Sequence, residues 1–156
     1  LGSNLSIIES GRKINEKMPE HVINLTLDAF NECNKTIQDS SILILGISYK
    51  PDVKDIQLTP AEQVINKLQD LGVKIHIYDP YFKSKKVFGI TVAENIENVI
   101  STVDASIILT AHDEFKKIEI ALFSKMLNPI LIDTRGIIDP LLAKNEKLIF
   151  RGLGRG

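Results

Sequence analysis

The sequence is poor in the residues that build disulfide frameworks and cysteine-rich metal sites. Its 156 residues include one cysteine, Cys33, and no tryptophan. A single thiol excludes an internal disulfide and a multi-cysteine metal site. The three histidines are far apart in the sequence, so we predict no metal. A chain without disulfides suits a reducing compartment, and we expect a cytoplasmic protein.

The sequence also lacks long hydrophobic runs and an excess of charge of one sign. Nineteen basic and twenty acidic residues give a net charge of −1. No apolar run approaches the roughly 20 residues that cross a bilayer, and no signal peptide opens the chain. We therefore expect neither a membrane nor a nucleic acid as the main partner. The first residue is Leu1 and not methionine, so we expect a piece of a longer chain.

The composition that remains is that of a globular domain, with 44% hydrophobic and 25% charged residues. Residues 5–34 are predicted to form helix in one or two pieces, with a kink or break at Pro19 and an arm before it. Apolar residues recur there at spacings of three and four, which favours a core or subunit contact over a cofactor site. The stripe consists of Ile7, Gly11, Ile14, Met18, Val22, Leu25, Ala29 and Cys33. Cys33 is thus expected to be a small core residue and not a nucleophile.

After Ser40 the pattern changes to short apolar runs that alternate with helical segments. A capping box at Thr59 with Pro60 behind it marks one helix start. The expected strands are 41–46, 73–78, 105–110, 129–132 and 147–150, with a weaker segment over 87–92, and the expected helices are 60–71, 95–103 and 114–127. This alternation predicts βαβ units. The fold class is therefore α/β, a Rossmann-like, doubly wound and mainly parallel sheet preceded by a long helical arm.

Ligands of such sheets bind outside the carboxyl ends of the strands. Lys50 and Arg135 follow two different strands there and are the cations best placed to hold a phosphate with the helix start at Thr59. Alternatively, both cations pair at the surface with acids that also follow these strands. Those acids are Asp52, Asp55 and Asp133. Spacing alone leaves both interpretations open.

The loop after the first strand does not have the form of a dinucleotide-binding turn. Gly46 lacks the further glycines of G-x-G-x-x-G, and thirteen residues separate it from Pro60. We therefore do not expect NAD to bind here in the usual Rossmann manner. No acidic pair directly follows the first strand, which excludes a receiver-type phosphorylation domain.

The histidines offer weaker candidates. His112 and Asp113 are adjacent and suggest an acid–base pair, but adjacent side chains seldom point together, and Asp113 as a helix N-cap is the favoured interpretation. His76 belongs to the opposite face of its strand from Ile75 and Ile77 and is expected to be structural. His21 has no ligand partner at helical spacing.

Five motifs of the sequence recur together in one known protein family. The loop after the first strand reads GISYKPDVKDIQLTPA over 46–61, and the other motifs are GRKIN over 11–15 with Met18-Pro19, IYDP over 77–80, TAHDEFK over 110–116 and IDTRG over 132–136. In order and spacing they resemble the carboxy-terminal domain of the UDP-glucose/GDP-mannose dehydrogenase family of nucleotide-sugar 6-dehydrogenases, and they cover nearly the whole chain. The first loop is similar to the signature loop of that domain, and its YKPDV wording is most like the UDP-N-acetylmannosamine branch.

The resemblance implies a two-step, NAD-dependent oxidation of the C6 hydroxymethyl group of a nucleotide-sugar to a carboxylate. In that family an amino-terminal domain holds NAD and a central helical region supplies the catalytic cysteine. Neither a G-x-G-x-x-G turn nor the cysteine-containing catalytic loop occurs in this sequence, and Cys33 does not match the catalytic position. Residues 1–36 would then be the end of the central helical, dimerising region and residues 37–156 the nucleotide-sugar-binding domain. We expect no catalytic residue here, no turnover by this chain alone, and NAD bound mainly by a domain absent from it.

Carried over residue by residue, Lys50 matches a lysine that contacts the nucleotide-sugar, and Tyr49 lies beside it at an aromatic position. Arg135 matches an arginine that also reaches this substrate. Gln57 departs from the family, which commonly has Arg-Glu-Ser-Pro where this chain has Gln-Leu-Thr-Pro over 57–60. That arginine reaches toward NAD, so the missing charge at Gln57 puts cofactor affinity in question.

Two functions follow. The first is the substrate-binding domain of a UDP-sugar dehydrogenase, with UDP-N-acetylmannosamine as the expected substrate and UDP-glucose or GDP-mannose as alternatives. The second is a non-catalytic interaction or oligomerisation module. The partners implied are the nucleotide-sugar, the missing NAD-binding and catalytic domains, and further copies of the chain joined through the N-terminal helix.

Overall fold

A computed structural model describes residues 2–153, without the side chains of 2–6 and 8–15. The helices are α1 (Gly2–Glu32), α2 (Pro60–Asp70), α3 (Glu97–Ile100), α4 (Asp113–Lys116), the 3-10 helix η1 (Ile120–Lys125) and α5 (Pro140–Asn145). The strands are β1 (Ser41–Leu45), β2 (Lys74–Tyr78), β3 (Lys86–Val87), β4 (Ile90–Thr91), β5 (Ala105–Ile108), β6 (Ile130–Asp133) and β7 (Ile149–Gly152).

Five strands form one parallel sheet in the order β2-β1-β5-β6-β7, which confirms the predicted Rossmann-like α/β fold. In register, Ile42 of β1 lies between Ile75 of β2 and Ala105 of β5. The chain moves outward from β1 to β2 and then returns to the other side of β1 at β5. This change of direction makes the carboxyl ends of β1 and β5 the switch point, where such sheets leave a crevice.

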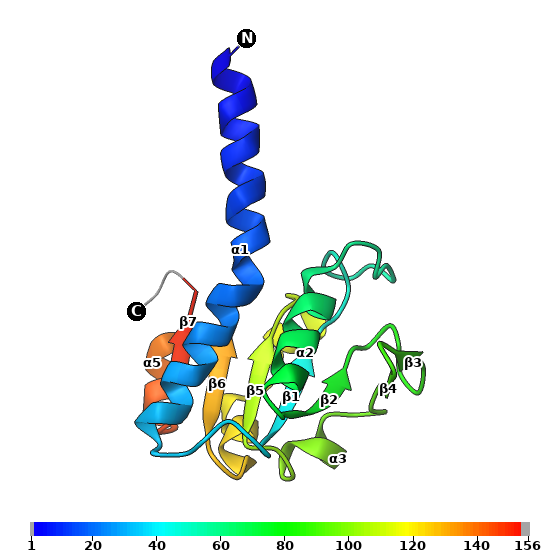
Figure 1. Cartoon of the computed structure of the whole chain (residues 1–156). Coiled ribbons are helices and arrows are strands. Elements are labelled where there is room, and N and C mark those ends of the chain that lie inside the picture. The colour runs from blue at the N-terminus through cyan, green and yellow to red at the C-terminus, as the bar shows by residue number, and fades with distance from the viewer. Residues whose placement is uncertain (1, 154–156) are drawn as a thin grey trace.

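Each face of the sheet is covered by its own apolar core, which explains why the central strands are continuous hydrophobic runs. Ile42 and Ile44 of β1 contribute to a core shared with α1 and α2. Leu43 and Leu45 point the other way, into a core shared with α3, α4, η1 and α5. Figure 1 shows α1 and α2 side by side on one face of the sheet.

Of the kink or break predicted at Pro19, the break does not occur, because α1 runs in one piece from Gly2 to Glu32. A proline removes one backbone donor but has a helical φ, so it bends a long helix more readily than it ends it. The expected arm is present, since the N-terminal half of α1 projects beyond the sheet (Figure 1). The stripe is buried at Val22 and Ala29, whereas Ile7 is exposed; the burial of Gly11 and Ile14 lies outside what the structure describes.

The C-terminal half of α1 is fastened to the sheet by packing and by charge. Val22, Ala29 and Phe30 are buried in the first core, and the half-buried Cys33 packs against it, as expected for a small core residue. Arg151 of β7 donates from Nε to Asp28 at 2.9 Å and also binds Glu32. The C-terminal half of α1 is thereby held against β6 and β7.

Three segments differ from the sequence prediction. The helix expected over 114–127 is two short pieces, α4 and η1, because the chain becomes extended at Glu119 and turns so that Phe115 and Phe123 both reach the second core. The segment 87–92 belongs to a separate antiparallel hairpin of β3 and β4. The helix α5 was not predicted, although Asp139 followed by Pro140 is a cap signal, and Asp139 accepts the N–H of Leu141.

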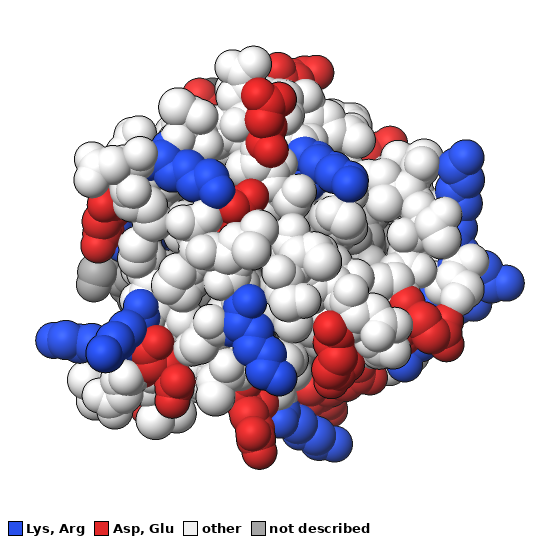
Figure 2. Space-filling model, turned by 90° about the horizontal axis from the view of Figure 1, so that it is seen from below, with Lys and Arg blue, Asp and Glu red and all other residues white. Residues whose placement is uncertain are grey.

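Charges are mixed on the end of the molecule opposite the arm. Figure 2 shows lysine and arginine interspersed with aspartate and glutamate on that face. No helix within residues 2–153 is long and apolar enough to cross a membrane.

Two glycines offer a matched test of how tightly the end of β1 is packed. Gly46 and Gly89 both have positive φ, at 84° and 77°, but a Cβ on Gly46 would lie 2.6 Å from Cβ of Thr110, whereas a Cβ on Gly89 meets nothing within 4 Å. We expect Gly89→Ala to lower the free energy of unfolding by about 1–2 kcal/mol, the cost of the left-handed conformation. Gly46→Ala should lose about 1–3 kcal/mol more, because overpacking adds to that strain. Urea unfolding of both variants measures the difference, and equal losses would contradict the close approach of Gly46 to Thr110.

Candidate functional site

A groove with a volume of about 660 Å³ opens at the carboxyl edge of the sheet. It is bounded by α1 near Met18 and Pro19, by the loop after β1, by the start of α2, and by the ends of β5 and β6. The groove therefore lies beside the switch point between β1 and β5, where ligands of doubly wound sheets bind. Segments far apart in the sequence meet there because parallel strands present all their carboxyl ends at one edge.

Three of the four predicted site residues line this groove, namely Tyr49, Lys50 and Arg135. Tyr49 is 51% exposed, and the Lys50 Nζ lies 5.8 Å from the centre of its ring. Gln57 is exposed and outside the residues that line the groove, with its N–H bound to Asp55 Oδ1 at 2.8 Å.

The acids expected as alternative partners of Lys50 and Arg135 accept backbone N–H groups instead. Among the described side chains, neither Lys50 nor Arg135 forms an ion pair with Asp52, Asp55 or Asp133. Asp133 is fully buried at the end of β6 and accepts the backbone N–H groups of the turn that follows it. The donors are Arg135 and Gly136 at 2.9 Å to Oδ1 and Ile138 at 2.8 Å to Oδ2. Asp133 thus shapes the turn that carries Arg135, and among the described side chains it forms no ion pair with the Arg135 guanidinium.

The start of α2 adds a positive helix end to the groove. Thr59 is its N-cap, and Oγ1 accepts the N–H of Ala61 at 3.3 Å, with Pro60 in the first turn. The helix start is as predicted, but the N–H of Thr59 binds the carbonyl of Ile56, so the reciprocal bond of a capping box is replaced by a turn. The N-terminus of a helix attracts anions through its free N–H groups and its dipole. Two cations and this helix end make the groove suited to a phosphate-bearing ligand.

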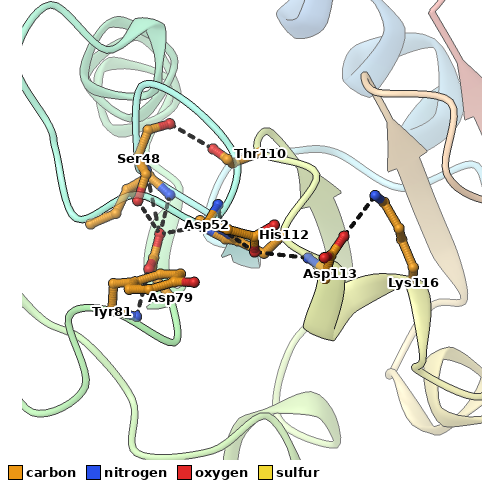
Figure 3. Close-up of polar contacts among 9 residues, drawn as sticks. Ser48, Asp52, Asp79, Tyr81, Thr110, His112, Asp113 and Lys116 are labelled. Carbon is orange, nitrogen blue, oxygen red and sulfur yellow. Dashed lines mark hydrogen bonds and ion pairs between the residues drawn. The ribbon is translucent and has the colours of Figure 1, made fainter.

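The loop after β1 is held by a buried polar cluster, drawn in Figure 3. Asp79, directly after β2, and His112, after β5, are both fully buried and meet at 3.0 Å between Oδ2 and Nε2. Asp79 Oδ2 also accepts the N–H of Ile47 at 2.9 Å and the N–H and hydroxyl of Ser48 at 3.3 and 3.1 Å. Its Oδ1 accepts the N–H of Tyr81 at 2.9 Å.

Burial disfavours the charged form of Asp79, but the hydrogen bonds from His112 and from the N–H groups of Ile47 and Tyr81 outweigh it. The pKa of the Asp79 carboxyl is therefore below its usual value, and the group stays ionised in the native protein.

The predicted roles of the histidines and of Asp113 change accordingly. His112 pairs with Asp79 and not with Asp113, and Asp113 is not a helix cap: His112 has the N-cap position of α4, while the Asp113 carboxylate binds Lys116 at 2.8 Å. Sequence reasoning missed the His112–Asp79 pair, whose signal was that each residue follows a buried strand. His76 is half-buried on β2, where burial and Lys74 lower its pKa, and His21 is exposed on α1. The described side chains contain no group of three or more histidine, cysteine or acidic residues placed to hold a metal.

Comparison with known protein families shows to which family the chain belongs. Residues 43–140 match the UDP binding domain of the UDP-glucose/GDP-mannose dehydrogenase family. The chain belongs to this family. The matched range begins in β1 and ends at the start of α5, so it contains the first loop, the Asp79–His112 pair and Arg135.

Individual family members resemble the chain over almost its full length. It is 32% identical over 158 residues to a UDP-N-acetyl-D-mannosamine dehydrogenase of Methanococcus vannielii, a match that covers 99% of this chain and 36% of that protein. A solved structure of UDP-D-ManNAc dehydrogenase from Pyrococcus horikoshii superposes with a TM-score of 0.82 at 31% identity, covering 93% of this chain and 32% of that one. The structure of an NDP-N-acetyl-D-galactosaminuronic acid dehydrogenase from Methanosarcina mazei gives 0.83 at 28% identity, covering 92% and 30%. The chain thus spans about a third of the length of the relatives it matches.

The lowered pKa of Asp79 makes a prediction about pH. An amide in place of this carboxylate must present its NH₂ group to a backbone N–H, because both oxygens accept such groups. We expect Asp79→Asn to lower the free energy of unfolding at neutral pH by about 1–3 kcal/mol, the cost of an unsatisfied buried group.

The stabilisation by ionised Asp79 is present above the usual carboxyl pKa of about 4 and is lost as the pH falls through the lower native value. The difference between wild type and Asp79→Asn should therefore shrink in acid. Unfolding from pH 7 to acid measures it, with the exposed Asp70 changed to Asn as control. A difference that is constant with pH would contradict an ionised Asp79.

Proposed function

We propose that this chain is the nucleotide-sugar-binding part of an NAD-dependent 6-dehydrogenase whose substrate is UDP-N-acetylmannosamine. The proposal rests on one observation, which is that Lys50, Arg135 and the start of α2 line the same groove. The substrate is supported by the relatives named UDP-N-acetyl-D-mannosamine dehydrogenases, at 32% and 34% identity, and by the YKPDV wording of the first loop. UDP-glucose and GDP-mannose are the alternatives.

In this proposal the groove holds the diphosphate of the substrate. The Arg135 guanidinium forms paired hydrogen bonds with phosphate oxygens, and Lys50 acts as a point charge. The start of α2 adds its free N–H groups. Tyr49, half exposed beside Lys50, offers a flat apolar surface against which a base or sugar ring packs.

The oxidation itself needs groups outside this chain. NAD supplies the hydride acceptor when bound, and we propose that it is held by the amino-terminal domain of the parent enzyme. Gln57, exposed at the edge of the domain, is the residue of this chain that would face that cofactor. Residues 1–36 are then the end of the central helical region, and this chain binds the nucleotide without turning it over.

Charge reversal in the groove tests the binding site. We expect Lys50→Glu and Arg135→Glu each to weaken the binding of UDP about tenfold or more, the value of a charge-assisted hydrogen bond. Isothermal titration calorimetry with UDP, UDP-N-acetylhexosamine and NAD measures the affinities, and NAD should give no response. Lys74→Glu, at the opposite end of β2, is the control. Unchanged affinity for UDP in both groove variants would contradict the site.

The projecting half of α1 favours a second function, which is compatible with the first. Ile7 is 68% exposed on a helix that extends beyond the sheet (Figure 1). A large apolar side chain on such an arm suits contact with another copy of the chain, as expected for an oligomerisation region.

A substitution at Ile7 tests self-association through the projecting half of α1. We expect Ile7→Glu to shift the chain toward monomer, because a buried charge in an apolar contact is unfavourable. Sedimentation velocity over a range of concentrations measures the shift, and Glu16→Gln, an exposed change on the same helix, is the control. Identical sedimentation of wild type and Ile7→Glu would exclude this contact.

A further inference from the structure

We propose that His112 is a positioning residue for nucleotide binding, and that it acts through the main chain of the loop that carries Tyr49 and Lys50. The identity of the ligand rests on the proposed function above. His112 is fully buried and is not among the residues that line the groove, so it has no direct route to the ligand. Its two ring nitrogens bind two different segments of the protein, as Figure 3 shows.

The hydrogen bonds of the His112 ring determine where its proton lies. The backbone N–H of Asp52 donates to Nδ1 at 2.9 Å, and a backbone N–H can only donate. Nδ1 therefore carries no proton, and Nε2 carries the proton that it donates to Asp79 Oδ2 at 3.0 Å. Both nitrogens are in use inside the protein, which leaves neither for acid–base work at the groove. The His112 ring therefore links Asp79 to Asp52 through two hydrogen bonds.

The main-chain groups that Asp79 and His112 bind lie on either side of Tyr49 and Lys50 in the sequence. Before Tyr49, the main chain at Ile47 and Ser48 is bound to Asp79, and the hydroxyl of Thr110 donates to the Ser48 carbonyl at 2.8 Å. After Lys50, the N–H of Asp52 is bound to His112. The segment 47–52 is thus fixed at both ends to buried groups, and Tyr49 and Lys50 project from its middle into the groove.

Asp52 has a left-handed conformation that its contacts hold in place. Its φ is +58°, a region that aspartate enters more readily than most residues with a Cβ but still at some cost. Its N–H binds His112, and its carboxylate accepts the N–H of Asp113 at 3.0 Å, so both its main chain and its side chain are held by residues that follow β5. Without the acceptor at Nδ1, the N–H of Asp52 loses its partner, and the main chain from Lys50 to Asp52 is free to relax.

Two variants of His112 separate positioning from stability. In His112→Asn, the amide oxygen stands at the same number of bonds from the backbone as Nδ1, so it can accept the N–H of Asp52, but the contact with Asp79 and the ring packing are lost. In His112→Phe the ring packing against Tyr81 and Phe115, with centres 5.2 and 5.3 Å away, is kept and both hydrogen bonds are lost. A purely structural role predicts that UDP affinity is unchanged in His112→Phe as long as the variant is folded, or that it falls with any loosening of the core. A positioning role predicts that it follows the bond to Asp52.

The experiment measures amide hydrogen exchange, UDP affinity by calorimetry and urea stability on the full chain, at a temperature where circular dichroism shows every variant folded. We expect His112→Phe to speed exchange of the Asp52 amide and to weaken UDP binding about tenfold, as the loss of one well-placed hydrogen bond allows. His112→Asn should stay within about threefold of wild type in UDP affinity. Phe123→Leu loosens the second core away from the loop and should lower stability without changing UDP affinity.

Two results would overturn the proposal. One is a UDP affinity that falls in step with stability across all three variants, and the other is wild-type UDP affinity in His112→Phe. A wild-type chain that binds no UDP would instead contradict the proposed function. In that case amide hydrogen exchange alone tests whether His112 positions the loop. An Asp52 amide that exchanges at the wild-type rate in His112→Phe would refute that role.

Discussion

The carboxylate of Asp79 sits at the end of β2 without contact with water, and the groove depends on how its charge is satisfied. A buried charge is costly unless it is hydrogen-bonded, and here donors come from the first loop, from His112 and from Tyr81. The donors of Ile47 and Ser48 reach Asp79 only when the loop after β1 folds over the ends of β2 and β5. The need to satisfy one carboxylate therefore helps to shape this long loop, together with the burial of Ile47 in the first core.

The same principle operates at the end of β6. Asp133 is also buried, and it accepts three backbone N–H groups of the turn that presents Arg135. Both carboxylates take their donors mainly from the main chain, so neither neutralises a groove cation. The result is a groove in which Lys50 and Arg135 face an anionic ligand, while the acids nearest to them in sequence serve the backbone.

Much of the fold could be predicted from the sequence, because the strands are short apolar runs and α2 begins with a marked cap. Tyr49, Lys50 and Arg135 could also be placed at one sheet edge, since parallel strands bring their carboxyl ends together. Of the two options at Pro19, a kink or a break, the break does not occur, because a proline has a helical φ and α1 continues through it. The continuous helix predicted over 114–127 was wrong, because burial of both Phe115 and Phe123 requires a turn between them. The pairing of His112 with Asp79 joins residues 33 apart in the sequence, and no local spacing indicates it.

The most direct test of this account is a crystal structure of the chain grown with UDP. The account predicts the diphosphate between Arg135, Lys50 and the start of α2, with residues 47–52 unchanged and His112 still bound to Asp79. Nucleotide density elsewhere on the domain, or a groove in which Lys50 and Arg135 turn to Asp52 and Asp133 while UDP binds, would contradict it.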